Sequence, residues 1–485
     1  MKPIKTCLGV VQGIEREGVA VFLGLPYAAS PTGALRWRSP LPAAPWNGTF
    51  DATRFPNRCL QPPYPEILAG GELPGEQSED CLYLNIYTPA ATDANRPVIC
   101  WIHGGGYIQG SANEYDGSVL AREQDCVVVG INYRLGVFGF CNVSSLGDEY
   151  AGSVSRGFED QIAALRWIRD NISDYGGDPD SVSIWGESGG AGSVLALQGA
   201  PEAEGLFHSS VAFSPGDIDL GNTSPPDAAS SLASHFQIDD DVRTRLLALS
   251  AEELFEASTQ GAAPSAQTVD GTVITRAPAE AIREKGRGGP PLIVGCNKDE
   301  GSYLAHLTEL APTGLELVRA AFVPLISRRA PDAYLAYLNQ CVPSGDESAM
   351  IEQIWYDLFR SATLRNAEAA SEAGAGGWVY NFEVPTDNPL GVTHGCEIAF
   401  TFNLFAMSAA QLVMFHESTH ENRALARLWA GALVQFARTG DPNGAGLPEW
   451  ARYDAVRRSC LLFDSAPRIA EDPDGIDVRR AYGLE

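Results

Sequence analysis

The sequence contains few lysines, no long apolar run and no closely spaced pair of cysteines. Only four of the 485 residues are lysine, and none has a serine three positions earlier, which excludes the hydrolases that use a Ser-x-x-Lys pair. No run of about 18 apolar residues occurs, so the sequence predicts no membrane-spanning helix. The ten cysteines are scattered without a Cys-x-x-Cys pair, which argues against a zinc ribbon or a dithiol redox site.

Positive charge is also scarce. The 34 lysines and arginines are outnumbered by 61 aspartates and glutamates, which gives a formal net charge of −27 at pH 7. Such a surface repels phosphate backbones and anionic lipid headgroups, so we expect neither nucleic acid nor a membrane as a partner. The first residues, MKPIKTCLGVVQGIEREG, lack the apolar core and cleavage site of a secretory signal, and we expect a cytoplasmic protein.

Short apolar runs alternate with helical patterns along the chain. The runs are continuous, which is typical of strands buried on both faces of a mostly parallel sheet. They are Val98 to Ile102, Cys126 to Ile131, Val182 to Trp185, Leu292 to Val294 and Trp378 to Phe382. Helical spacing of apolar residues follows in FEDQIAALRWIRDNI (158–172) and again over 425–436. No linker or repeat divides the chain, so we expect an α/β fold forming one domain over residues 1–485.

The stretch SVSIWGESGGAG (181–192) places a serine between glycines directly after a predicted strand. Residues 186–190 fit the G-x-S-x-G pattern of a nucleophile elbow, a sharp strand-to-helix turn that lifts the Ser188 hydroxyl above the sheet. Among 50 glycines the bare pattern is also compatible with a glycine-rich turn that holds an idle serine. The surrounding motifs therefore have to decide between these interpretations.

One further segment, upstream of the elbow, fits a serine nucleophile. His103-Gly104-Gly105-Gly106 ends a buried strand, and its exposed backbone N–H groups suit an oxyanion hole, with another N–H from Gly189.

A serine hydroxyl also needs a base and an orienting carboxylate, in the chain order serine, acid, histidine. Asp299 and Glu300 follow one buried strand and His394 follows the next. The residues alone do not separate Asp299 from Glu300.

Taken with these motifs, the chain resembles the type-B carboxylesterase family of the α/β-hydrolases, which includes bacterial para-nitrobenzyl esterases, mammalian carboxylesterases and cholinesterases. The resemblance covers nearly the whole chain. Its blocks are Gly24 to Ala28, Ser78 to Asn85, His103 to Gly106, Asn132 to Arg134, Asp160-Gln161, Gly176 to Pro179, the elbow, Asp299 to Gly301, His394-Gly395 and Thr439 to Asn443.

The resemblance implies an α/β-hydrolase fold, with a large, mostly parallel twisted sheet, helices on both faces, and helical or loop insertions over the active site. It implies a catalytic triad of Ser188, Glu300 and His394, and so favours glutamate as the acid. It assigns the oxyanion hole to the N–H groups of Gly105, Gly106 and Gly189.

The resemblance also implies a role for further residues around this triad. Glu187 and Glu397 would lie near the site as carboxylates that stabilise the histidine cation, although a structural role for both is an open alternative. The family usually links the cysteines that match Cys59 and Cys81 in a disulfide, and a reducing cytosol would leave them as thiols. The segment between these two cysteines lacks the cation-binding tryptophan of cholinesterases, so we do not expect a preference for choline esters.

Two other functions are weighed against this one. His416-Glu417-Ser418-Thr419-His420 spells the H-E-x-x-H zinc signature of metallopeptidases. That signature requires a helix across the motif, whereas Ser418 followed by Glu421 predicts a helix that begins after Ser418. A catalytically inactive, adhesion-type member of the same fold would typically lack a triad residue, and all three are present here.

The sequence therefore predicts an enzyme that hydrolyses small-molecule carboxylic esters through an acyl-serine intermediate, with no metal and no cofactor. We expect a monomer or a small homo-oligomer. The acyl and alcohol preference is not predicted, because loops build those pockets.

Overall fold

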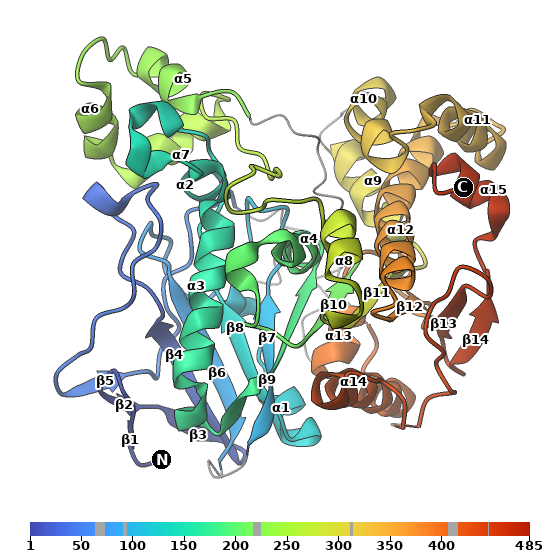
Figure 1. Ribbon diagram of the computed structural model, residues 1–485, viewed down its shortest axis with the longest axis horizontal. Coiled ribbons are helices and arrows are strands. Elements are labelled where there is room, and N and C mark those ends of the chain that lie inside the picture. The colour runs from blue at the N-terminus through green and yellow to red at the C-terminus, as the bar shows by residue number, and fades with distance from the viewer. Residues whose placement is uncertain (64–72, 91–94, 217–224, 311–313, 406–415, 445) are drawn as a thin grey trace. The chain divides into compact units, whose positions relative to one another are not determined.

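The computed structural model describes residues 1–63, 73–90, 95–216, 225–310, 314–405, 416–444 and 446–485. The chain forms two compact units (Figure 1). The first unit comprises Met1–Tyr64, Glu72–His208 and Leu220–Ala277, and the second comprises Pro65–Gly71, Ser209–Asp219 and Pro278–Glu485. The expectation of one domain over residues 1–485 stays a prediction.

The strands of the first unit form a mixed sheet in the order β9-β7-β8-β6-β4-β3. Strand β7 is parallel to β8 and β9, whereas β6 is antiparallel to β8 and β4. Every residue of β7 and β8 is buried, which accounts for the continuous apolar runs at Val98–Ile102 and Val127–Ile131. The bounds are β3 Ile14–Arg16, β4 Val19–Pro26, β6 Tyr83–Pro89, β7 Arg96–Ile102, β8 Val127–Ile131 and β9 Gly177–Glu187; a separate small sheet holds β1 Ile4–Lys5, β2 Val10–Gln12 and β5 Thr49–Asp51.

Helices pack on this sheet, with α1 against β4, β6 and β8, α3 against β9, and α4 against β7 and β9. The predicted helix over 158–172 is α3, which buries Ile162, Leu165 and Ile168 on one side. A short 3₁₀ turn follows and ends at Gly176, whose φ of +81° suits glycine. The bounds are α1 Ser118–Gln124, α2 Gly136–Gly139, α3 Arg156–Asn171, α4 Gly189–Ala196, α5 Ala228–His235, α6 Val242–Ala248 and α7 Ala251–Thr259.

The second unit has a sheet in the order β14-β13-β12-β11-β10. The first four strands along the chain are parallel, and β14 is antiparallel to β13. The bounds are β10 Ser209–Phe213, β11 Leu292–Asn297, β12 Gly377–Phe382, β13 Ser459–Phe463 and β14 Arg468–Glu471. Its helices are α8 Pro278–Lys285, α9 Glu300–Leu310, α10 Leu315–Ile326, α11 Pro331–Cys341, α12 Glu347–Ala373, α13 Glu397–Phe402, α14 His420–Thr439 and α15 Gly475–Ala481.

The apolar stripe over 425–436 lies in α14, as predicted, but the predicted cap of this helix is wrong by one residue. Thr419 caps the helix, because its extended backbone lets its hydroxyl accept a hydrogen bond from the Asn422 N–H at 3.0 Å. The Ser418 hydroxyl instead accepts hydrogen bonds from the Arg423 guanidinium at 2.7 and 3.1 Å. No helix within the described ranges is both long and apolar enough to cross a membrane.

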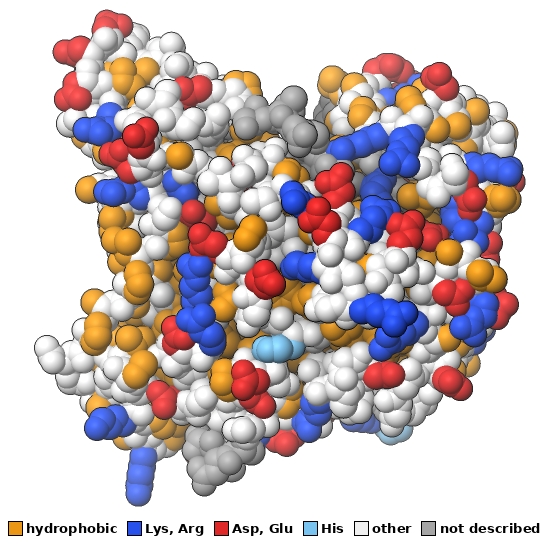
Figure 2. Space-filling model, viewed as in Figure 1, with side chains coloured by type: hydrophobic (Ala, Val, Ile, Leu, Met, Phe, Trp, Pro, Cys, Tyr) orange, Lys and Arg blue, Asp and Glu red, His pale blue; other side chains and the backbone are white. Residues whose placement is uncertain are grey.

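Acidic and basic side chains are interspersed on the face shown in Figure 2. Many of the ion pairs are exposed, such as Arg169 with Asp170 at 2.7 Å and Arg457 with Asp454 at 3.0 Å. Exposed pairs of this kind contribute little to stability, because water and salt screen them.

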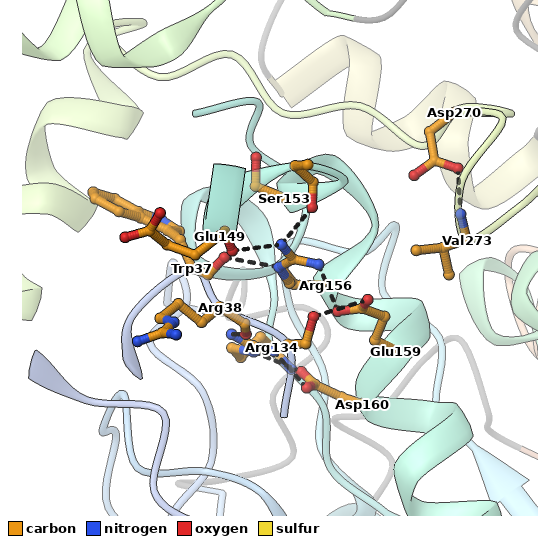
Figure 3. Close-up of polar contacts among 12 residues, drawn as sticks. Trp37, Arg38, Arg134, Glu149, Ser153, Arg156, Glu159, Asp160, Asp270 and Val273 are labelled. Atoms are coloured by element: carbon orange, nitrogen blue, oxygen red, sulfur yellow. Dashed lines mark hydrogen bonds and ion pairs between the residues drawn. The ribbon is translucent and has the colours of Figure 1, made fainter. Parts of the chain in front are cut away.

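Buried ion pairs in the first unit fix the loop that follows β8. Arg134 donates two hydrogen bonds to the Asp160 carboxylate on α3, at 2.8 and 2.7 Å, and both side chains are almost fully buried (Figure 3). Nearby, Arg156 donates to Glu159 at 2.7 Å and to the Trp37 carbonyl at 2.7 Å. The Arg134–Asp160 pair therefore connects the loop at residues 132–136 to α3. Removing either partner of this pair would leave an uncompensated buried charge, which is strongly destabilising.

Candidate active site

Ser188 lies on a sharp turn between β9, which ends at Glu187, and α4, which begins at Gly189. Its backbone has φ +55° and ψ −121°, a conformation that a non-glycine residue adopts only under strain. A Cβ atom at Gly186 would lie 2.4 Å from the Gly190 carbonyl oxygen, and one at Gly190 would lie 2.0 Å from the Ile102 carbonyl oxygen. The flanking glycines are therefore required because strand and helix approach too closely for any side chain.

The loop at His103–Gly106 runs alongside this serine. A Cβ atom at Gly104 would lie 3.2 Å from the Ser188 Cβ, and one at Gly189 would lie 3.2 Å from the Gly106 nitrogen and 3.3 Å from the Tyr107 nitrogen. Gly105 and Gly106 have φ of +97° and +61°. Among the described residues, no atom lies within 4 Å of a Cβ placed on Gly106. Backbone N–H groups thus gather beside open space next to Ser188, as an oxyanion hole requires.

Aromatic contacts hold this loop in place. The His103 ring stacks on Tyr133 with ring centroids 4.4 Å apart, and the Tyr133 hydroxyl donates to the His103 carbonyl at 2.9 Å. Burial lowers the pKa of His103 to about 4, so this imidazole is neutral at neutral pH. The Tyr107 ring packs into the core against Phe140 and Phe158, with centroids 5.0 and 5.9 Å away. The loop is therefore anchored at both of its ends.

The second unit contains a buried acid–base pair. His394 Nδ1–H donates to Glu300 Oε2 at 2.5 Å, and Glu300 is completely buried. The other carboxylate oxygen, Oε1, accepts from the Asn297 backbone N–H at 2.6 Å and from the Ser214 hydroxyl. A carboxylate with these three donors keeps its orientation, and it fixes the imidazole tautomer that has a proton on Nδ1.

Asp299 has a different set of partners. Its carboxylate accepts from the Val392 N–H at 2.9 Å, and its own N–H donates to the Val392 carbonyl at 3.0 Å. Asp299 therefore ties the loop before His394 to the start of α9. Of the two neighbouring acids, only Glu300 is hydrogen-bonded to His394 in the described structure.

Glu397 and Glu187 lie in different surroundings. Glu397 is completely buried, and it interacts with the same two residues as Glu300: it accepts from the Asn297 side-chain amide and lies 3.3 Å from the Ser214 hydroxyl oxygen. Glu187 lies in the first unit, where its Oε2 is 2.7 Å from the position that a Cβ atom on Gly104 would occupy. Glu397 thus belongs to the network around the acid, and Glu187 belongs to the elbow and the oxyanion loop.

Sequence reasoning did not identify Ser214, Asn297 or Phe359. The first two are small polar residues at the ends of β10 and β11, and they meet because these strands are parallel neighbours. Position at the carboxyl end of a buried strand was the available signal, since ligands and reactive groups gather there in α/β sheets. Phe359 lies on α12 and stacks on His394, with ring centroids 4.4 Å apart. No local sequence pattern indicates that contact.

Comparison with known proteins now identifies the family. The sequence model of the carboxylesterase family matches residues 2–476. The chain is 33% identical to the para-nitrobenzyl esterase of Bacillus subtilis over 97% of this chain and 96% of that protein. It is 34% identical to mouse carboxylesterase 1E over 93% of this chain and 88% of that protein. The chain belongs to the carboxylesterase family.

Solved structures of carboxylesterases agree with this assignment. A PNB esterase superposes with a TM-score of 0.87 at 31% identity, covering 99% of both chains. Carboxylesterase EST55 of Geobacillus stearothermophilus gives 0.86 at 35% identity, covering 99% of this chain and 100% of that one. The predicted α/β-hydrolase fold and the predicted class of carboxylic-ester hydrolase are both confirmed.

In this carboxylesterase the H-E-x-x-H motif is not arranged as in a zinc peptidase. His416 is buried outside α14, with Nε2 donating to the Val384 carbonyl at 3.2 Å and Nδ1 accepting from the Asn422 amide at 3.1 Å. His420 is the exposed first residue of α14. The two histidines therefore do not share one helical face, as zinc ligation by this motif requires. The described residues include no group of three His, Cys, Asp or Glu side chains placed to hold a metal.

The two cysteines of the implied disulfide are free thiols in this structure. Cys59 and Cys81 are both buried, and Cys59 Sγ accepts from the Leu135 N–H at 3.3 Å. A hydrogen bond with Cys59, together with burial, raises the pKa of the Cys81 thiol well above its ordinary value. The two thiols are neighbours, and the disulfide between them stays a prediction. Residues 64–72 of the segment between them lie outside the described residues.

Proposed function

We propose that Ser188 is the nucleophile, His394 the general base and Glu300 the orienting acid of this carboxylesterase. The observation that carries the proposal is the buried hydrogen bond from His394 Nδ1 to Glu300 Oε2 at 2.5 Å. A histidine whose Nδ1 proton is directed at a buried carboxylate presents Nε2 as its basic atom, which is the arrangement of the general base in a serine hydrolase. The strained elbow at Ser188 supports the choice of nucleophile.

The reaction proceeds in two halves. Ser188 Oγ attacks the acyl carbonyl carbon while His394 Nε2 takes the hydroxyl proton, and the Glu300 carboxylate stabilises the imidazolium that forms. His394 then returns the proton to the departing alcohol, which leaves an acyl-serine ester. A water molecule, deprotonated by the same imidazole, attacks this ester and releases the acid. In both halves the backbone N–H groups of Gly105, Gly106 and Gly189 stabilise the oxyanion.

Two further carboxylates are proposed to stabilise the positive charge that His394 acquires during the reaction. Glu397 interacts with Asn297 and Ser214, the same two residues that hold Glu300, and so adds negative potential behind the imidazolium. Glu187 is proposed to do the same from the side of the elbow.

The substrates proposed are small carboxylic esters, neutral or cationic rather than anionic; the names of the similar proteins support the ester class, and the net charge of −27 supports the exclusion of anions. Choline esters are not favoured, because the segment from Cys59 to Cys81 contains no tryptophan. A monomeric or small homo-oligomeric state and a cytoplasmic location stay predictions.

The test is hydrolysis of neutral 4-nitrophenyl esters by the purified protein and its variants. Ser188→Ala and His394→Gln are expected to lower kcat by at least about 10³-fold, with the fold retained. Ser234→Ala, an exposed serine on α5, serves as the control and should keep full activity. A chelator should leave the rate unchanged. Loss of activity with a chelator, or full activity of Ser188→Ala, would contradict the proposal.

A further inference from the structure

The base of the proposed reaction needs a second constraint beyond its hydrogen bond to Glu300. That bond constrains the position of Nδ1, whereas the tilt of the ring also depends on its pivot about the Cβ–Cγ bond. Such a pivot moves Nε2, the atom that exchanges protons with the serine. A displacement of about 1 Å at a reacting atom costs a large factor in rate, so the plane of the ring has to be fixed as well.

Phe359 provides a flat surface against the face of this imidazole. The two ring centroids are 4.4 Å apart and the planes are inclined by 26°, which is a stacked arrangement. Both side chains are buried, with Phe359 at 4% and His394 at 6% exposure. A hydrogen bond at the edge of the ring and an aromatic plane on its face together define both the position and the tilt of the imidazole.

Phe359 is itself held on a firmly anchored turn of α12. Two residues before it, the Asp357 carboxylate accepts from the Tyr482 hydroxyl at 2.5 Å and from the Tyr334 hydroxyl at 2.9 Å. One residue after it, Arg360 donates two hydrogen bonds to Asp474, both at 2.7 Å. All of these polar groups are on the second unit, and they connect α12 with α11 and with the segment at α15. The aromatic plane therefore has little freedom to move away from His394.

We infer that Phe359 is a positioning residue that fixes the plane of the His394 ring and stabilises its charged form through the face of the aromatic ring. The inference rests on the proposed role of His394 as base. An imidazolium placed over an aromatic face is attracted by the negative potential of that face, whereas a leucine of similar size offers only apolar contact. The gain occurs when His394 carries a proton, and so in the transition states of both halves of the reaction.

The substitution Phe359→Leu removes the aromatic face and keeps an apolar side chain. We expect kcat to fall about three- to tenfold with KM nearly unchanged. Because the wild-type face stabilises protonated His394, its loss should also move the acid limb of the pH profile of kcat/KM to lower pH. Glu300 contacts the imidazole, and the other charged residues on the segments packed here are Asp299, Glu397, Asp357 and Arg360. All five are the same in both proteins.

Two further variants distinguish this role from simple packing. Phe359→Tyr keeps the aromatic face and should restore kcat and the position of the acid limb. Phe436→Leu removes a buried aromatic ring of α14, which packs edge to face on Trp378, and should lower thermal stability without moving the acid limb. Active-site titration with an organophosphonate counts the folded enzyme in each preparation.

The outcomes separate this inference from the proposed function. If Phe359→Leu behaves as Phe436→Leu does, with an unshifted acid limb and unchanged kcat per titrated site, Phe359 has no positioning role and the proposed function stands. If Phe359→Tyr remains as impaired as Phe359→Leu, the aromatic face is not what matters and the inference is also wrong. If His394→Gln keeps full activity, the proposed function fails and the inference fails with it.

Discussion

At the scale of single residues, two neighbouring acids perform two separate tasks. Glu300 contacts the imidazole of His394, and Asp299 holds the backbone at Val392 in the loop before that histidine. The sequence predicted both positions as candidates, because both follow a buried strand. It could not separate them, since the direction of each side chain depends on the backbone at the junction of β11 and α9. Only the family resemblance favoured Glu300.

The substitution Glu300→Gln is expected to lower kcat by about 10³-fold or more, because the amide cannot stabilise the imidazolium and favours the wrong tautomer. Asp299→Asn keeps an oxygen that can accept from the Val392 N–H, so it should cost less than about tenfold. Steady-state kinetics on one neutral ester at several pH values compares the two variants. A larger loss of kcat in Asp299→Asn than in Glu300→Gln would show that the assignment of Glu300 as the acid is wrong.

At the scale of elements, the elbow and the strands around it were the most predictable parts of the molecule. The continuous apolar runs of β7 and β8, the spacing of α3 and the glycines near Ser188 all follow from local rules. The contact between Phe359 and His394 and the position of Ser214 beside Glu300 could not be predicted. Both depend on the pairing and packing of segments that are far apart in the sequence. A single amino-acid sequence does not show which distant segments come into contact.

The close approach of the elbow to β7 makes Gly190 intolerant of a side chain. In Gly190→Ala the added Cβ would lie 2.0 Å from the Ile102 carbonyl oxygen, so strand or helix must shift, at a cost of about 1–3 kcal/mol. We expect the thermal midpoint to fall by at least about 3 °C, and kcat to fall because the oxyanion loop follows Ile102. Gly288→Ala, where open space surrounds the added atom among the described residues, is the control. Equal midpoints for both variants would refute the steric argument.

The buried carboxylate of Asp357 makes the stability of the second unit depend on pH. Burial raises the pKa of Asp357 to about 7, against the opposing hydrogen bonds from Tyr482 and Tyr334. Between an unfolded pKa of about 4 and this value, the folded state binds the proton more strongly than the unfolded state does. This group therefore lowers stability as pH rises from about 4 to 7 and adds no further change above that.

Asp357→Asn removes this titration. Relative to the wild type, the variant is expected to gain stability by about 2–3 kcal/mol as pH is raised from 5 to 8. Thermal unfolding of both proteins across this range measures the difference. Asp346→Asn, at the exposed N-cap of the same helix, should show a much smaller trend. A wild-type-to-variant difference that does not change with pH would show that Asp357 is already ionised in the folded protein.

At the scale of the whole molecule, the dominant property is the net charge of −27. The α/β-hydrolase fold and the reaction class were predicted through the resemblance to carboxylesterases, which many short motifs in one order along the chain support. Neither the ester preference nor the surroundings of the acyl and alcohol groups followed from it. Those depend on loops whose conformation is set by packing, not by local sequence.

The net charge is expected to influence how charged esters approach. For a 4-nitrophenyl ester with a remote ammonium group, kcat/KM should fall about two- to tenfold relative to a neutral ester when salt is raised from about 0.01 to 0.5 M. Screening shortens the range of the attraction and leaves the neutral ester unaffected. An equal response of both esters to salt would show that the net charge plays no part in substrate encounter.

The central claim is that one serine, Ser188, carries the covalent chemistry. Mass spectrometry of the intact protein and its peptides after treatment with an organophosphonate tests this most directly. The account predicts one adduct per chain, on the peptide that contains Ser188, formed in step with the loss of esterase activity and absent from Ser188→Ala. Complete inactivation with Ser188 unmodified, or an adduct on another residue that accounts for the lost activity, would contradict it.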